Sequence, residues 1–212
     1  MPRLPQAALK YPLNRVTNMS LPRFAVVDLE TSGLNTTRHR VLQVGVVTVD
    51  SAGVVLDEWE TFVRLKWPLS RVGPTHIHGI TRSMLRGAPT VAAMLETLHS
   101  KLEGSLFVAH NARFDGELLI QAAQRAGQSS AQMAVLERRL CTLRMSRRLD
   151  PGREFSHRLG DLCERYDVAL DRPHNALADA HSTAAMLPHL LIAHDVQSES
   201  DLTPFLDRNN SR

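Results

Sequence analysis

The sequence has 212 residues, of which 43% are hydrophobic and 22% charged, and its formal net charge is +3 at pH 7. This length and apolar content suit one α/β domain with a core of its own and argue against a disordered chain. The mildly basic balance is compatible with phosphate binding, but it is common in proteins with no nucleic-acid role.

Cysteine usage and hydropathy exclude further classes. The two cysteines, Cys141 and Cys163, have no CxxC spacing, so they predict no zinc site and suit a reducing cytoplasm. No apolar stretch approaches the roughly 20 residues that span a bilayer, so we expect no membrane segment. A cytoplasmic location is expected. A mitochondrial one is the alternative, because four basic residues and no acidic ones precede Asp28.

The first half of the chain reads as strands followed by a long loop. Residues 1–22 predict a flexible basic arm, and 24–29 a short buried strand. Residues 40–50 and 53–64 are rich in Val and Thr around a turn, which is typical of a β-hairpin. Residues 65–88 contain several Pro and Gly and predict a long loop.

The second half alternates helices and strands. Helical patterns and short apolar runs are listed here in chain order: a helix over 90–102, a strand over 106–109, a helix over 114–126 closed by Gly127, a strand over 139–142, a helix over 158–166 and a helix over 175–191 whose last turns Pro188 should disturb. Residues 195–212 are polar and predict a flexible tail, leaving one folded domain over 23–194. The order predicts an α/β fold with a mixed sheet flanked by helices.

Two carboxylates end the first predicted strand. Asp28 and Glu30 are two residues apart, so their side chains project from the same face. Neighbouring carboxylates repel each other and are costly to bury, and a cation resolves that conflict. A strand simply entering a polar turn would also explain this pair.

Three more residues complete a candidate metal site. Asp115 follows a buried strand at a helix start, and His174 precedes Asp179 by five residues on the last helix. Each alone has an ordinary explanation: the helix dipole, a loop histidine or a solvated acid. Together, four carboxylates can hold two Mg²⁺ or Mn²⁺ ions about 3.5–4 Å apart for phosphoryl displacement. A histidine is suited to take the proton of the attacking water.

Four segments resemble one family. They are VVDLETSGL at 26–34, IHGIT at 77–81, HNARFD at 110–115 and HNALADA at 174–180. Their order resembles the DEDDh, DnaQ-like 3′→5′ exonucleases, the family of the epsilon proofreading subunit of bacterial DNA polymerase III. The resemblance covers residues 24–192.

The resemblance implies a ribonuclease-H-like fold with a mixed five-stranded sheet, and an exonuclease domain over 23–194. It implies two divalent ions, Mg²⁺ or Mn²⁺, held by Asp28, Glu30, Asp115 and Asp179, with His174 as the general base. The products implied are nucleoside 5′-monophosphates.

The sequence departs from the family pattern at three places. Ser32 stands where many members have a second threonine. Cys141 precedes Thr142, at a position where the family often has an aspartate. The segment with Gly73 and Pro74, before IHGIT, lacks an acid that some members place there. This last departure leaves recognition of the 3′ end open, but not the metal site.

The resemblance also gives candidate substrate contacts. Leu34 is the expected wedge against the terminal base, with Thr31 and Gly33 beside the 3′ sugar. His78 is a candidate contact to the terminal nucleotide, Phe114 to the next base, and Asn111 should order the helix start. Core or structural roles for Leu34, His78 and Phe114 stay open.

Several arginines lie in one stretch of the sequence. They are Arg138, Arg139, Arg144, Arg147, Arg148 and Arg153. They could contact phosphates, or they could form a solvated basic face.

Three functions are consistent with these observations. The leading one is an exonuclease acting on single-stranded or frayed DNA 3′ ends in proofreading or repair, with a DNA polymerase as an open partner. The second is an RNA-trimming enzyme similar to oligoribonuclease or ribonuclease T. The third, of another class, is a non-catalytic nucleic-acid-binding or polymerase-docking module. The oligomeric state is open.

Overall fold

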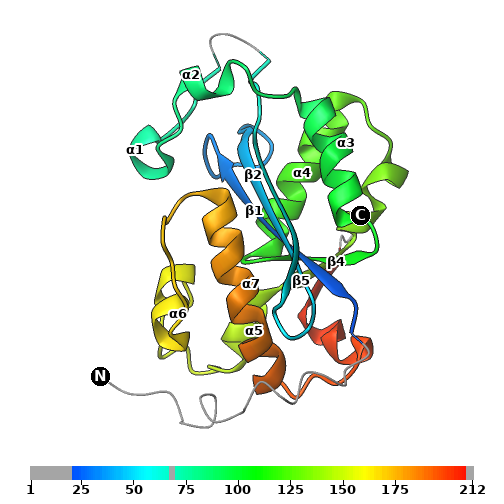
Figure 1. Ribbon diagram of the computed structural model, residues 1–212, viewed down its shortest axis with the longest axis vertical. Coiled ribbons are helices and arrows are strands. Elements are labelled where there is room, and N and C mark those ends of the chain that lie inside the picture. The colour runs from blue at the N-terminus through cyan, green and yellow to red at the C-terminus, as the bar shows by residue number, and fades with distance from the viewer. Residues whose placement is uncertain (1–20, 67–69, 209–212) are drawn as a thin grey trace.

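The computed structural model describes residues 21–66 and 70–208. It shows one mixed sheet with helices on both faces (Figure 1). The predicted N-terminal arm, 1–22, lies outside the described residues except for its last two.

The sheet has six described strands: β1 (Arg23–Thr31), β2 (Val41–Val49), β3 (Val55–Phe62), β4 (Ser105–Ala109), β5 (Arg138–Cys141) and β6 (Leu206–Arg208). The α-helices are α1 (Thr75–His78), α2 (Arg82–Leu85), α3 (Val91–Leu102), α4 (Ala112–Ala126), α5 (Thr142–Arg148), α6 (Leu159–Tyr166) and α7 (Ala176–Ala193). Two 3₁₀ helices, η3 (Ser130–Leu136) and η4 (Glu199–Phe205), complete the elements of the described part of the chain.

Strand order is β3-β2-β1-β4-β5-β6. The pairs β1–β4 and β4–β5 are parallel, and the other three pairs are antiparallel. The predicted mixed α/β class is confirmed, with a sixth strand, β6, in addition to the five expected.

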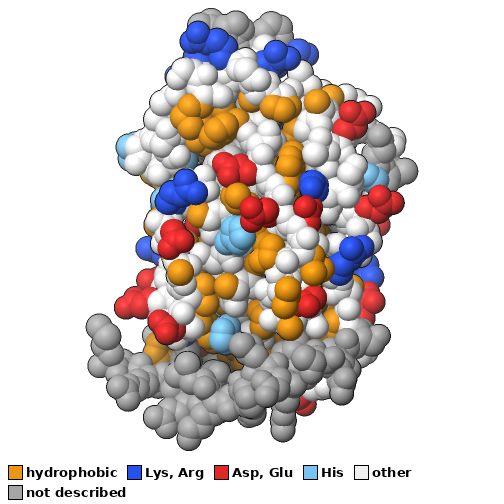
Figure 2. All heavy atoms as spheres, viewed as in Figure 1, with side chains coloured by type: hydrophobic (Ala, Val, Ile, Leu, Met, Phe, Trp, Pro, Cys, Tyr) orange, Lys and Arg blue, Asp and Glu red, His pale blue; other side chains and the backbone are white. Residues whose placement is uncertain are grey.

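Residues 65–88 are less irregular than the predicted loop. Two single-turn helices, α1 and α2, lie in this stretch, and residues 67–69 fall outside the described part. Ile80 and Leu85 pack with Leu42 of β2 in a small apolar cluster that anchors the segment to the sheet. Figure 2 shows Lys and Arg side chains at this upper end of the molecule.

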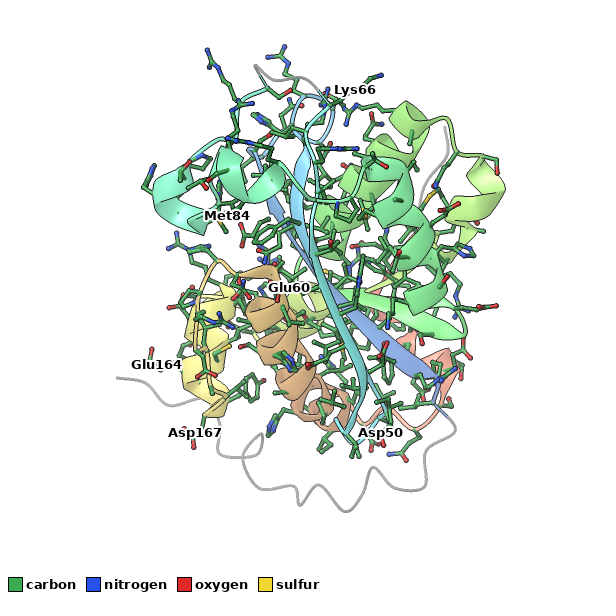
Figure 3. The ribbon with its side chains drawn as sticks, turned by 45° about the horizontal axis from the view of Figure 1, so that its top comes forward. Asp50, Glu60, Lys66, Met84, Glu164 and Asp167 are labelled. Carbon is green, nitrogen blue, oxygen red and sulfur yellow. The ribbon has the colours of Figure 1, made fainter. Side chains whose placement is uncertain are left out.

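The β2–β3 hairpin turns at Asp50, as the sequence predicts. The Asp50 carboxylate accepts hydrogen bonds from the Ala52 and Val54 amides, each at 2.9 Å. Asp50 and Lys66, labelled in Figure 3, mark opposite ends of the structure that the hairpin spans.

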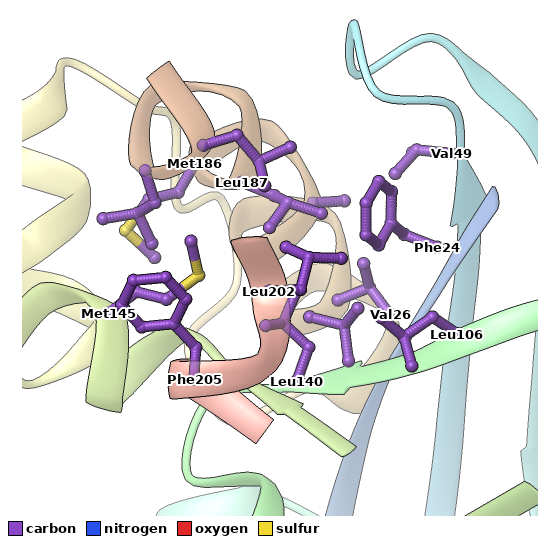
Figure 4. Close-up of a cluster of buried hydrophobic side chains, with 14 of the residues drawn as sticks. Phe24, Val26, Val49, Leu106, Leu140, Met145, Met186, Leu187, Leu202 and Phe205 are labelled. Atoms are coloured by element: carbon purple, nitrogen blue, oxygen red, sulfur yellow. The ribbon is translucent and has the colours of Figure 1, made fainter. Parts of the chain in front are cut away.

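The side chains of β1 alternate between two cores. Phe24 and Val26 are buried against α7 and the C-terminal segment, as Figure 4 shows. Ala25, Val27 and Leu29 pack on the opposite face against α3 and α4. Period-two alternation therefore fixes which helix layer each β1 residue faces.

Residues 195–208 are not the flexible tail that their polar composition predicts, and residues 209–212 lie outside the described part. Leu202 is fully buried, Phe205 is nearly so, and β6 pairs with β5. The polar residues between these anchors face solvent or cap η4. Leu202 and Phe205 therefore complete the core, although these apolar residues are too sparse in the sequence to predict it.

The predicted arginine cluster is divided among structural roles. Arg138 pairs with Glu199 at 2.7 Å, and Arg144 pairs with Asp207. Arg148 lies 5.5 Å from the centre of the Phe205 ring, and Arg139 is 2% exposed. These four arginines contact the C-terminal segment or pack against α4, whereas Arg147 and Arg153 are exposed.

Two helical details differ from expectation. Helix α7 continues through Pro188 to Ala193, because the buried proline ring packs beside the hairpin turn at Gly53 and offsets the loss of one backbone hydrogen bond. Helix α5 follows β5 directly and was not predicted. Within the described residues, none of the helices is long and apolar enough to cross a membrane.

Replacing Leu202 with alanine tests the role of the C-terminal segment. The variant should lose about 2–5 kcal/mol of unfolding free energy, as for other buried leucines. Urea denaturation measures this, with Leu56→Ala on exposed β3 as the control. A loss below 0.5 kcal/mol, on the order of surface substitutions, would contradict the packing described.

Candidate active site

Strand β1 brings two carboxylates to the α7 face. Asp28 and Glu30 continue the same row of side chains as Phe24 and Val26. Asp28 is half-buried and Glu30 is buried. Along β1, this row of side chains thus changes from apolar to acidic near the start of α7.

The loop before α7 supplies a histidine, and the first turn of α7 supplies a third carboxylate. Asn175 caps α7 by accepting from the Ala178 amide at 3.0 Å. The His174 amide donates to the Asp179 carboxylate at 3.1 Å, and His174 has a left-handed φ of 64°. Ligand atoms of Glu30, His174 and Asp179 lie within 4.8 Å of one another.

Strand β2 seats the first turn of α7, through two residues that the sequence analysis did not single out. Gly45 pairs with Asp28, and a Cβ at Gly45 would overlap the backbone of Ala176. Only glycine permits this close approach, which brings Asp179 to the carboxylates of β1. A glycine inside a strand can signal such an approach.

Gln43 is the second of these residues. It pairs with Glu30 in the sheet register and is 1% exposed. Its side-chain oxygen accepts from the Ala176 amide at 3.3 Å, and its nitrogen donates to Glu60 at 2.8 Å. In the sequence, a glutamine within the largely apolar β2 was the feature that could have indicated this role.

Helix α4 contributes the fourth carboxylate. Asp115 is 4% exposed in the first turn of α4, which begins directly after β4. The buried side chain of Arg139 packs under Gly116, and its charge lowers the pKa of Asp115. That effect is smaller than the opposing effect of burial.

The carboxylates raise one another's pKa values. Burial raises the pKa of Asp28 well above its ordinary value, followed by repulsion from Asp115, Asp179 and Glu30. Burial and Asp179 raise the pKa of Glu30 to about 7, and burial raises that of Asp115 to about 8. Burial also raises the pKa of Asp179. Because these four acids resist being ionised at the same time, a bound cation would stabilise the site.

This donor set fits hard divalent cations. Carboxylate oxygens are the ligands that Mg²⁺ and Mn²⁺ prefer, and the four acids converge from β1, α4 and α7. The five predicted site residues therefore lie together in the fold.

Leu34, Asn111 and Phe114 line one groove beside this cluster. The groove has a volume of about 390 Å³ and runs between residues 34–37 and the start of α4. Leu34 is 86% exposed, which excludes the core alternative for this side chain. The sequence predicts that Asn111 orders the helix start, but its side chain makes no capping hydrogen bond to α4. Asn111 instead adopts a left-handed φ of 74° and faces the groove.

Thr31 and Gly33 lie in the chain between Glu30 and Leu34. The Thr31 hydroxyl donates to the Gly33 carbonyl at 2.9 Å. Gly33 has a φ of 150°, and the His39 ring lies where a Cβ would stand. These contacts fix the backbone that presents Leu34.

His78 is 8% exposed and sits close enough to His174 for the two rings to interact electrostatically. Its Nδ1 accepts from the Ile80 amide at 3.0 Å, which places the ring proton on Nε2. Nε2 makes no well-formed hydrogen bond within the described residues, although the Val72 carbonyl is near. A structural role in α1 is evident, and a substrate contact stays a prediction.

Comparison with known proteins places the chain in a family. The exonuclease family (RNase_T) matches residues 25–187, and the chain belongs to this family, in its DEDDh, DnaQ-like branch. DNA polymerase III PolC-type of Oceanobacillus iheyensis is 31% identical over 197 residues, 92% of this chain. The matched region is 13% of that relative's length.

Solved structures confirm the ribonuclease-H-like fold. Exonuclease I of E. coli, solved with a dT13 oligonucleotide, has a TM-score of 0.69 at 22% identity, over 80% of this chain and 41% of its own. The nuclease domain of 3′hExo, a DEDDh family member bound to rAMP, has a TM-score of 0.69 at 14% identity, over 84% of this chain and 94% of its own.

Stability of the metal-free protein should depend on pH in an unusual direction. Because the pKa values of Glu30 and Asp115 rise from 4.5 and 3.8 to about 7 and about 8 on folding, the folded state binds more protons between these limits. The unfolding free energy in EDTA should therefore fall as pH rises through this window. Mg²⁺ should raise the melting temperature more at pH 8 than at pH 6.

Thermal unfolding across this pH window measures the effect. Asp115→Asn removes one titrating acid and should flatten the profile. A melting temperature that rises with pH, in both proteins, would refute the electrostatic description.

Gln43→Leu tests how α7 is seated. Losing the acceptor for the Ala176 amide should weaken Mn²⁺ binding and lower kcat about tenfold or more, since small displacements cost large rate factors. Calorimetry with Mn²⁺ and single-turnover rates measure the two effects. Glu60→Gln keeps an acceptor for Gln43 and is the matched control. Unchanged metal affinity in Gln43→Leu would show that Gln43 does not position the metal ligands.

Proposed function

We propose that this chain hydrolyses the terminal phosphodiester bond at nucleic-acid 3′ ends and releases nucleoside 5′-monophosphates. The convergence of four carboxylates with raised pKa values beside His174 is the observation that carries the proposal. Membership of the exonuclease family supports it.

Asp28, Glu30, Asp115 and Asp179 would hold two Mg²⁺ or Mn²⁺ ions. Such ions neutralise the charge that develops on attacking and leaving oxygens. In the bound state all four acids would be ionised, so metal binding would release protons from a site that keeps them near neutral pH.

His174 would accept the proton of the attacking water. Its ring is exposed at the edge of the site while its amide is tied to Asp179, so the side chain can meet solvent without leaving the cluster. Leu34 would pack on the terminal base, and Phe114 on the next, because both line the same groove. Thr31 and Gly33 would lie beside the 3′ sugar, and His78 beside the terminal nucleotide.

We propose DNA as the substrate, in proofreading or repair. The PolC-type relatives are DNA polymerases, and Exonuclease I was solved with single-stranded DNA. A DNA polymerase is therefore the protein partner that this setting favours. RNA trimming is the second candidate, because the structurally similar 3′hExo domain was solved with rAMP.

Substitutions at Asp28 and His174 separate metal binding from proton transfer. Asp28→Ala should abolish turnover and keep the fold, since its charge is needed only with the metal. His174→Ala should lower kcat by about 10²–10⁴-fold and keep Mn²⁺ affinity. Rapid-quench rates and calorimetry measure the two effects, and full activity in His174→Ala would exclude it as the base.

The proposed activity is tested on 5′-labelled single-stranded DNA and RNA of matched sequence, with Mg²⁺, Mn²⁺ or EDTA. We expect a ladder that shortens by one nucleotide at a time, faster on DNA and absent in EDTA or with Asp28→Ala. Faster RNA shortening would select the second candidate. No shortening of either strand would favour a non-catalytic binding module.

A further inference from the structure

Two segments of the chain carry basic residues and no acidic ones. Residues 31–49 contain Arg38 and Arg40 without any Asp or Glu. Residues 61–95 contain five basic residues and likewise no Asp or Glu: Arg64, Lys66, Arg71, Arg82 and Arg86. All seven side chains are exposed. We call these seven residues the basic collar.

The two segments meet at one end of the sheet. β1 ends, β2 begins and β3 ends there, and the Val63 amide donates to the Leu42 carbonyl at 2.8 Å. Gly73 lies so close to the Ser32 backbone that a Cβ would overlap it. Figures 2 and 3 show this end of the molecule, with Lys66 labelled in Figure 3.

This end also borders the acidic cluster. Thr31 follows Glu30 directly, and His78 of the second segment interacts electrostatically with His174. Arg125 of α4 donates to the carbonyls of Thr36 and Thr37 and fixes the first segment. The collar is therefore held in place on the rim of the candidate active site.

Four of the collar's arginines pair with no carboxylate of the described residues. Within residues 21–66 and 70–208, no ion pair involves Arg38, Arg64, Arg71 or Arg86. Basic residues elsewhere, such as Lys101 and Arg138, pair with acids at 2.8 and 2.7 Å. The positive potential of these four arginines is thus left uncompensated at this end of the sheet.

We propose that the basic collar binds the phosphates of the nucleic-acid strand upstream of its 3′ nucleotide; this inference rests on the proposed function. Four carboxylates at the reaction centre repel a polyanion, and a basic rim counteracts this repulsion. Arginine forks bind phosphate oxygens without reading sequence. Contacts of this kind release counterions, so binding must weaken steeply with salt.

The test removes three collar charges together. Arg64→Gln, Arg71→Gln and Arg86→Gln in one chain should weaken binding of a fluorescent single-stranded 20-mer about tenfold or more in EDTA, where nothing is cleaved. The slope of log affinity against log salt should fall by about 2, since each single-strand phosphate contact contributes about 0.7. Fluorescence anisotropy from low to high salt measures both.

A matched triple variant controls for net charge. Arg23→Gln, Lys101→Gln and Arg138→Gln remove the same charge at the opposite end, where β1 and β5 begin. This control should keep the affinity and the salt slope of the wild type within about twofold. Thermal unfolding shows whether both triple variants are folded.

The outcomes separate this inference from the proposed function. Wild-type affinity and slope in the collar variant, or an equal loss in the control, would overturn the collar even if the wild type shortens DNA. Weakened binding in the collar variant alone supports the collar, even if the wild type cleaves nothing and the proposed function fails.

Discussion

The first turn of α7 lies directly on β2, and the site depends on this contact. Gly45 leaves room for the backbone of α7, and Gln43 gives the Ala176 amide its acceptor. Because Gly45 pairs with Asp28 and Gln43 with Glu30, the residues that seat α7 lie beside the acids it completes. Displacing this turn would separate Asp179 from the other carboxylates while leaving both cores buried.

The same packing concentrates four acids that the metal-free protein cannot ionise together near neutral pH. Each acid has a raised pKa chiefly because of burial, and repulsion adds to it at Asp28, Glu30 and Asp115. The local fold is thus less stable than a neutral site would be, which is a common cost of a preorganised centre. Arginines without an ion pair lie at the rim beside these acids, and this local charge pattern would suit a cation-dependent enzyme acting on a polyanion.

Much of this arrangement is readable from the sequence, because it lies in local patterns. Asp28 and Glu30 share a face by strand periodicity, and the helix predicted over 175–191 corresponds to α7. Contacts between distant segments carry no such local signal. Gln43 and Gly45 contribute to the site through their contacts with α7, and Leu202 packs against residues that are distant in the sequence. Asn111 adopts a left-handed φ that its capping propensity did not indicate.

Anomalous diffraction from crystals grown with Mn²⁺ and thymidine 5′-monophosphate would show whether the four acids hold two metal ions. We expect two Mn²⁺ peaks about 3.5–4 Å apart, bounded by Asp28, Glu30, Asp115 and Asp179, with the phosphate between them and His174. Manganese bound elsewhere, or no peak among these carboxylates at a saturating concentration, would contradict this expectation.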